Sequence, residues 1–196
     1  MATHSAYFEH VHAFLLCGGQ SRRMGKDKAT LSYQGDTFEQ RVKRMALQSG
    51  VKDIFTVGGK GRDIVDEKPF HGPAAAAISA LTKGCTTAQL KQFEILLLLP
   101  VDMPLLSNKV LRRLIECSIK GQQSYFFNYD WFPLAIYQPF RYYDSLNRLL
   151  AASPMPSMKA LARVCEAQSI SLPTSLHHQL INVNTPLEFA RLAKVS

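Results

Sequence analysis

The sequence predicts a three-layer α/β/α protein, in which a mostly parallel sheet is covered by helices on both faces. Apolar runs alternate with helix-like segments along the chain, and residues 95–100 (ILLLLP) are apolar at every position. Such a run indicates a strand that is buried on both faces, which is the pattern of parallel sheets. With 46% hydrophobic content, 196 residues can bury one substantial core. We therefore predict one domain over residues 12–196, preceded by an N-terminal tail at 1–11.

The first strand and helix follow from apolar spacing and from glycine stops. Residues 11–17 (VHAFLLC) form a largely apolar run that ends at a glycine pair, which predicts a buried strand. Residues 37–49 place Phe38 and Val42 at helical spacing, and Gly50 ends this segment. The first predicted unit is thus a buried strand, a glycine-rich basic loop and a helix.

The next segments continue the alternation. Residues 54–57 form a second strand that two glycines close, and residues 63–65 form a short third strand. Residues 73–81 begin with proline, which suits the first position of a helix, and the alanine-rich run ends near Gly84. This segment is predicted to be a helix.

The second half opens on the most apolar strand of the chain, 95–100, which leads directly into Asp102. Ser107 is a favourable helix cap, and the apolar positions that follow it fit a period of 3.6 residues to about Lys120. The remaining predicted strands cover residues 124–128, 134–137 and 169–172, and the remaining helices cover 143–151, 157–166 and a last segment from Thr185.

Charge and composition exclude several classes of protein. The formal net charge of +8 suits anionic ligands. The basic residues are scattered and do not alternate with aromatic residues, so we expect no dedicated binding of nucleic acid. No segment reaches the length of a membrane span, and the N-terminus lacks the apolar core of a signal peptide. A cytoplasmic protein that does not bind membranes is therefore expected.

The cysteines and the first histidines do not predict a metal site. Four cysteines (Cys17, Cys85, Cys117 and Cys165) lie far apart and form no C-x-x-C pair, so they are predicted to be buried free thiols. His10 and His12 have the spacing of a ligand pair, but near a chain terminus we expect them to be solvated.

The loop after the first strand carries the clearest chemical signal. Glycines at 18 and 19 allow backbone N–H groups to approach phosphate oxygens, and Arg23 and Lys28 supply positive charge. The spacing fits neither G-x-x-x-x-G-K-[ST] nor G-x-G-x-x-G. The loop therefore predicts a different kind of nucleotide phosphate site, or, taken alone, a basic surface turn.

Asp102 supplies a second signal, because it follows the carboxyl end of the most apolar strand. Ligands of open parallel sheets bind outside these strand ends. Mg²⁺ needs only one or two protein carboxylates when phosphate oxygens and water complete its shell. Asp102 is therefore a candidate Mg²⁺ ligand; the alternative is a turn residue ahead of Pro104.

Residues 16–28 (LCGGQSRRMGKDK) closely resemble the L-x-G-G-x-S-x-R-M-G-x-D-K signature of the molybdenum cofactor guanylyltransferases, which are Rossmann-like nucleotidyltransferases of the nucleotide-diphospho-sugar transferase type. Three further segments match the family in order: Asp66 ahead of HGP at 71–73, PVDMP at 100–104, and INVNTP at 181–186. Residues 131–137 also resemble the family segment that follows a substrate-facing loop. The resemblance covers essentially residues 12–195.

The resemblance implies that GMP passes from GTP to the phosphate of molybdopterin or Mo-molybdopterin, and that pyrophosphate leaves. It implies catalytic roles for Arg23, Lys28 and Asp102, with Asp102 holding Mg²⁺. Asn182 and Asn184 would bind the pterin substrate; alternatively, the segment 182–186 caps the last helix through Asn184 or Thr185. The nucleotide would contact Leu16, Cys17, Gly18, Gly19, Ser21, Arg23, Gly25, Lys28, Asp66 and Asp102. Proteins that deliver or receive the cofactor are partners that the family suggests.

The sequence departs from the family pattern at positions that are expected to determine the specificity for the base and for the acceptor. Cys17 replaces the usual alanine, although the following glycine pair favours guanine. Residues 58–59 (GG) replace an asparagine-containing segment, residues 75–77 (AAA) lack a glycine, and the loop 121–131 lacks cations. Two alternatives thus stay open: a related nucleotidyltransferase with another base, such as that of CTP, or another acceptor; and a non-catalytic relative that binds a nucleotide or a partner.

Overall fold

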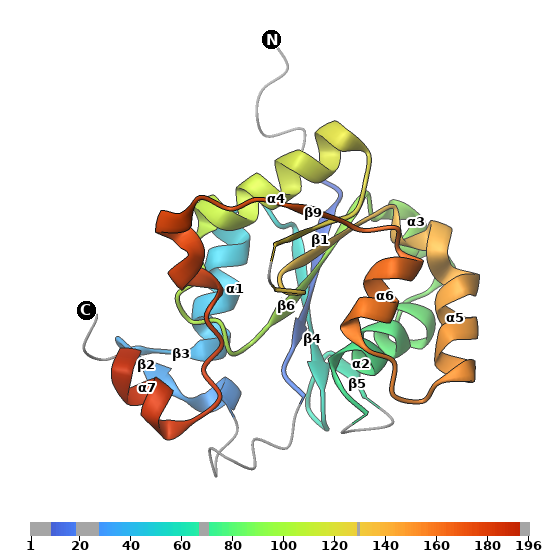
Figure 1. The fold of residues 1–196 in the computed structure, drawn as a ribbon. Coiled ribbons are helices and arrows are strands. Elements are labelled where there is room, and N and C mark those ends of the chain that lie inside the picture. The colour runs from blue at the N-terminus through green and yellow to red at the C-terminus, as the bar shows by residue number, and fades with distance from the viewer. Residues whose placement is uncertain (1–8, 19–27, 67–70, 129, 193–196) are drawn as a thin grey trace.

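A seven-stranded sheet forms the centre of the computed structural model, which describes residues 9–18, 28–66, 71–128 and 130–192 (Figure 1). Its strand order is β5-β4-β1-β6-β8-β7-β9. Neighbouring strands pair in parallel, except that β8 is antiparallel to both β6 and β7. The strands are β1 (Val11–Leu16), β4 (Asp53–Gly58), β5 (Ile64–Val65), β6 (Ile95–Pro100), β7 (Tyr125–Phe127), β8 (Leu134–Tyr137) and β9 (Gln168–Ile170). The prediction of a mostly parallel sheet is confirmed.

Helices cover both faces of this sheet, as predicted. Helices α1 (Phe38–Gln48) and α4 (Asn108–Gly121) pack together on one face; in Figure 1, α1 lies at the left and α4 runs across the top. Helices α2 (Pro73–Ser79), α5 (Tyr143–Ala152) and α6 (Met158–Val164) pack together on the other face. The three layers place a continuous apolar core around β1 and β6, whose residues are buried throughout.

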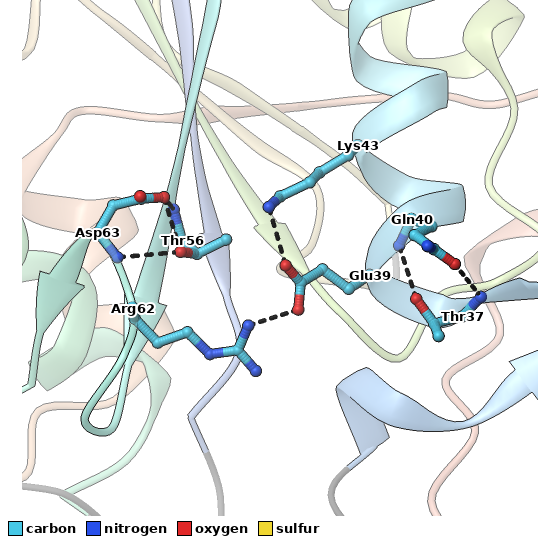
Figure 2. Close-up of polar contacts among 7 residues, drawn as sticks. All are labelled: Thr37, Glu39, Gln40, Lys43, Thr56, Arg62 and Asp63. Atoms are coloured by element: carbon cyan, nitrogen blue, oxygen red, sulfur yellow. Dashed lines mark hydrogen bonds and ion pairs between the residues drawn. The ribbon is translucent and has the colours of Figure 1, made fainter.

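Caps fix where the principal helices begin and end. Thr37 and Gln40 exchange hydrogen bonds in a capping box ahead of α1 (Figure 2). The Ser107 hydroxyl accepts the Val110 N–H at the start of α4, and Gln122 ends that helix in a left-handed conformation. Both starts agree with the sequence prediction.

Several short elements were not predicted. Helix α3 (Thr87–Gln92) begins at a Thr86–Gln89 capping box, and a hairpin of β2 (Ser32–Tyr33) and β3 (Asp36–Thr37) turns at residues 34–35, which both have positive φ. Helix α2 continues as the π-helical η3 (Ala80–Gly84), and β9 ends at Ile170 rather than Leu172. The 3-10 segments are η2 (Lys28–Thr30), η4 (Pro139–Tyr142) and η5 (Thr174–Leu180). These elements are too short for apolar periodicity to show them.

The expectation that His12 is solvated is wrong, although His10 is exposed. His12 lies in β1 and is 5% exposed; its ring stacks on Phe93 with 4.0 Å between centroids, and its Nδ1 is 3.2 Å from the Asp53 carboxylate. Burial lowers the pKa of His12, and the Asp53 charge opposes this effect. His12 belongs to the core because β1 begins immediately after His10.

The four cysteines are free thiols, as predicted, but only two are buried. Cys17 and Cys165 are buried, whereas Cys85 and Cys117 are partly exposed. Burial raises the pKa of Cys165 to about 12 and that of Cys85 to about 11, so both thiols stay protonated at neutral pH. Among the described residues, no helix is both long and apolar enough to cross a membrane.

Candidate active site

The carboxyl ends of β1 and β6 define the centre of the candidate site. Leu16 pairs with Pro100, and the Val101 N–H donates to the Leu16 carbonyl at 3.3 Å. Gly18 and Asp102, each two residues beyond this pair, therefore leave the sheet at the same level. The helices that follow β1 and β5 cover opposite faces, so β1 and β6 flank the point where the chain reverses its direction along the sheet. A crevice at this point is the expected place for a ligand.

Lys28 joins the first loop to Asp102. Its Nζ lies 2.7 Å from Asp102 Oδ2 and also donates to Asn184 Oδ1. The side chains of Lys28 and Asp102 are 15% and 19% exposed, so the ion pair is partly shielded from water. The structure thus brings together three residues that the sequence assigned to phosphate, metal and acceptor.

The C-terminal segment reaches this group through its backbone. The Val183 N–H donates to the Asp102 carbonyl at 2.8 Å, which places Asn182 and Asn184 on either side of the contact. Thr185 and Glu188 cap α7 (Pro186–Leu192) by reciprocal hydrogen bonds. The cap is therefore made by Thr185, and the Asn184 side chain is directed to Lys28 instead.

Glu188 ties this cap to the same region. Its carboxylate accepts the backbone N–H groups of Asn184 and Thr185 at 2.6 and 3.0 Å. These bonds, the one from Asn184 first, lower the pKa of Glu188. The backbone that presents Asn184 to Lys28 is thereby fixed.

A second carboxylate, Asp130, lies near this group and was not predicted. Because β8 runs antiparallel to β6, its first residues and the loop before them come to the edge where Asp102 lies. Asp130 Oδ2 is 3.5 Å from Asn182 Nδ2, and Oδ1 accepts the Phe132 N–H at 3.2 Å. Burial raises the pKa of Asp130, and the Asp102 charge adds to the increase, whereas the backbone hydrogen bonds oppose it. Asp130 was missed because a single aspartate ahead of Trp131 belongs to no periodic pattern and to no motif.

Asp66 lies farther along the same edge. It follows β5, three strand positions from β6, and its N–H donates to the Gly58 carbonyl at 2.6 Å. Asp66 lines a cavity of about 30 Å³ together with His71 and Lys83, among others. The structure therefore places Asp66 at one end of the candidate site and the Lys28–Asp102 pair at its centre.

Gly58, which replaces the expected asparagine segment, packs against the end of β1. A Cβ at Gly58 would lie 3.2 Å from the Gly18 nitrogen and 3.3 Å from the Cys17 carbonyl carbon, both backbone atoms that cannot easily move. Gly58 thus lets two strand ends approach closely where the base is expected.

Polar contacts hold the loop between β4 and β5 against α1 (Figure 2). Glu39 on α1 accepts from Arg62 of this loop and from Lys43 at 2.8 Å. The Asp63 carboxylate accepts the N–H and hydroxyl of Thr56 at 2.8 and 2.7 Å, which lowers the pKa of Asp63. These contacts hold in place the loop that leads into β5 and Asp66.

The donor set at the centre fits a hard divalent cation. Asp102 and Asn184 direct two oxygens onto one positive charge, the Lys28 ammonium. Oxygen ligands of this kind suit Mg²⁺, which keeps waters and phosphate oxygens for its other positions. The described part of the chain holds no group of three or more His, Cys, Asp or Glu residues arranged for a metal, so phosphate would have to complete this shell.

Part of the predicted nucleotide contact lies outside the described residues: Gly19, Ser21, Arg23 and Gly25. Of the others, Leu16 and Cys17 are buried at the end of β1, and Gly18 is exposed beside them. The predicted nucleotide contacts that the described site contains beyond β1 are therefore Gly18, Lys28, Asp66 and Asp102.

This fold and this edge site define a Rossmann-like nucleotidyltransferase. The chain belongs to the family of the MobA-like NTP transferase domain, whose sequence pattern matches residues 13–168. It is 27% identical over 181 residues to the molybdenum cofactor guanylyltransferase of Xanthomonas euvesicatoria pv. vesicatoria (strain 85-10), covering 91% of this chain and 92% of that protein.

Other relatives agree with this placement. A probable molybdenum cofactor guanylyltransferase of Mycolicibacterium paratuberculosis is 30% identical over 192 residues, covering 92% of this chain and 93% of that protein. The solved structure of a nucleotidyl transferase from Methanothermobacter thermautotroptrophicus superposes with a TM-score of 0.67 at 18% identity, covering 95% of this chain and 97% of that one. The predicted family and fold are confirmed.

Proposed function

We propose that this protein transfers GMP from GTP to the terminal phosphate of molybdopterin, in a form with or without molybdenum, and releases pyrophosphate. An oxygen of the pterin phosphate forms a bond to the α-phosphorus of GTP, and the bond from that phosphorus to the bridging oxygen of the β-phosphate breaks. The single observation that carries the proposal is the meeting of Lys28, Asp102 and Asn184 at the carboxyl edge of the sheet. The names of the relatives support the choice of GTP and molybdopterin.

The protein would act by alignment and by neutralisation of charge, because phosphoryl transfer of this kind needs no covalent nucleophile on the enzyme. A nucleotide that lies along the edge extends from Asp66 past Gly18 to Lys28. The backbone at Gly18 contacts the nucleoside, and the Lys28 ammonium neutralises phosphate oxygens. On binding, Lys28 would exchange its bonds to Asp102 and Asn184 for bonds to phosphate oxygens.

Asp102 and Asn184 are the residues that would hold Mg²⁺. When bound, the ion would neutralise the charge that builds up on the phosphate oxygens. Asp102 has two further tasks: its backbone carbonyl fixes Val183 at 2.8 Å, and its carboxylate positions Lys28. Asn182 and Asn184, which flank the Val183 contact with Asp102, would bind the acceptor.

Incubation with labelled GTP and molybdopterin tests the proposal directly. We expect release of pyrophosphate that depends on both the pterin and Mg²⁺, with formation of molybdopterin guanine dinucleotide. CTP and ATP serve as comparison substrates, because Cys17 and Gly58 lie where the base is expected. Faster turnover of CTP would assign a different base, and absence of transfer to molybdopterin with any nucleotide would reject the proposed acceptor.

A further inference from the structure

The loop ahead of β8 carries two neighbouring residues, Asp130 and Trp131, and lies beside Asp102 on the side away from Asp66. Trp131 packs against Phe126 with 4.7 Å between ring centroids and a 34° angle between ring planes, and it is partly exposed. Asp130 precedes it and is likewise only partly buried. Both residues reach this edge because β8 alone reverses the strand direction.

Asp130 is held in a defined orientation. Its Oδ1 accepts the Phe132 N–H at 3.2 Å, and its Oδ2 lies 3.5 Å from the Asn182 amide nitrogen. An ionised carboxylate can accept about four hydrogen bonds. The backbone N–H groups of Phe132 and Trp131 take two of them, and the Asn182 amide makes a long third, so a ligand that replaces Asn182 finds two positions open. Asn182 is adjacent to Val183, which binds the Asp102 backbone, so the carboxylate lies next to the centre of the site.

We propose that Asp130 and Trp131 bind the pterin ring of the acceptor and thereby select it, an inference that rests on the function proposed above. A pterin is flat, and its pyrimidinone edge carries an amino group beside a ring N–H. Two parallel N–H donors match the two-oxygen face of a carboxylate, and a flat heteroaromatic ring stacks on indole. The connection between β7 and β8 needs no cation for this part of the molecule, which agrees with the absence of Lys and Arg from residues 128–133.

The position of the loop agrees with this role. The nucleotide half of the edge contains Asp66, which follows β5, Gly18, which follows β1, and Lys28, which begins η2. Asp130 and Trp131 lie on the other side of Asp102, beside β8. An acceptor whose ring lies on Trp131 therefore has its phosphate directed toward Asp102 and Lys28, where the α-phosphate of the nucleotide is held.

Trp131 is the single tryptophan of the chain, so its fluorescence reports on this site alone. The full-length protein is titrated with pterin-6-carboxylate and, separately, with lumazine-6-carboxylate, which has an oxygen in place of the amino group. We expect the pterin to quench the emission, and the lumazine to bind about tenfold or more weakly, because its oxygen faces the Asp130 carboxylate. Free N-acetyltryptophanamide corrects for light absorbed by each compound.

Two variants separate the roles of the residues. Asp130→Asn should remove the preference for pterin over lumazine, since an amide offers both a donor and an acceptor. In the transfer assay it should raise the KM for molybdopterin about tenfold or more and leave the KM for GTP unchanged. Trp131→Ala should raise the same KM, whereas Trp131→Phe should restore it. Asp144→Asn, on α5 near the opposite edge of the sheet, is the matched control.

The outcomes distinguish this inference from the proposed function. Equal quenching by pterin and lumazine, or no change in the molybdopterin KM of Asp130→Asn while transfer proceeds, would overturn the inference and leave the transferase assignment in place. A loss of metal affinity in Asp130→Asn without a change in pterin affinity would assign Asp130 to the cation instead. Selective pterin binding without any transfer would support the inference and contradict the proposed reaction.

Discussion

Lys28 and Asp102 lie 74 positions apart in the sequence, and their side chains form an ion pair at 2.7 Å. Asn184 accepts from the same ammonium, so a residue near the end of the chain completes the group. Each residue comes from a different part of the chain. Lys28 lies after β1, Asp102 follows the central strand β6, and Asn184 precedes α7. The group therefore exists only when the three parts of the chain have folded together.

Lys28→Ala should weaken the binding of GTP in the absence of divalent metal. Loss of a hydrogen bond to a charged group costs about 1.5–3 kcal/mol, which corresponds to about 10- to 150-fold in the dissociation constant. Isothermal titration calorimetry measures this change. Lys120→Ala, at the exposed end of α4, is the control and should bind GTP like the unaltered protein; equal affinity in the Lys28 variant would remove this side chain from the phosphate site.

Asp102→Asn should keep the fold and lose catalysis. The amide has nearly the same shape, so the Val183 contact with the Asp102 backbone carbonyl can persist, but the negative charge that would hold Mg²⁺ is gone. We expect kcat to fall about 100-fold or more. Circular dichroism checks the fold, and pyrophosphate release measures the rate. A variant with unchanged turnover would place the metal elsewhere.

Gly84→Ala should destabilise the protein, because a Cβ at Gly84 would lie 2.5 Å from Cγ2 of buried Ile64. Overpacking of this kind costs about 1–3 kcal/mol. Thermal unfolding followed by circular dichroism should show a lower Tm. Gly59→Ala is the matched control for stability, since a Cβ there meets no atom within 4 Å; the idea fails if both variants unfold at the same temperature.

His12 should make stability depend on pH in the acid range. Burial lowers the pKa of His12 below 6.5 in the folded protein, so the folded state favours the neutral ring while the unfolded chain takes up a proton near pH 6.5. The contribution of His12 to the free energy of unfolding should therefore be complete above pH 6.5. It should decrease as the pH falls below that value.

Urea unfolding at a series of pH values measures this effect. His12→Phe keeps an aromatic ring on Phe93 and should reduce the decrease in stability between about pH 7 and about pH 5. His178→Gln alters an exposed histidine and should leave the profile as it is. A decrease of the same size in all three proteins would assign it to other groups.

The strongest sequence signals predicted the strand that ends at the centre of the site and the helix that follows it. An apolar run with no polar interruption predicted β6, and the spacing after Ser107 predicted α4. The rule that ligands bind beyond strand ends then placed Asp102 at an edge, and the contact with Lys28 agrees with that prediction. Roles assigned through resemblance to Arg23 and its neighbours stay predictions, since these residues lie outside the described part of the chain.

The acceptor half could not be predicted in the same way. A three- or four-residue strand has no periodicity that reveals its direction, so the sequence did not show that β8 runs against β6. The resemblance of residues 131–137 to the segment after a substrate-facing loop indicated this region but not Asp130 itself, and without the strand direction nothing connects that residue with Asp102. The burial of His12 was missed for a related reason, since the start of a strand close to a chain terminus resembles a frayed end.

The reversal of β8 also gives the two halves of the edge different freedom to vary. In the nucleotide half, Gly18 packs closely against Gly58, and Lys28 bonds to both Asp102 and Asn184, so a change there would disturb several contacts at once. The acceptor half is built by a surface connection between two strands, and such connections tolerate changes of length and composition. We therefore expect related enzymes to diversify their acceptors through residues 128–133 while the lysine, the aspartate and the glycine turn stay in place. The antiparallel strand β8 thus allows the loop that contacts the acceptor to change while the part of the protein that binds the nucleotide stays the same.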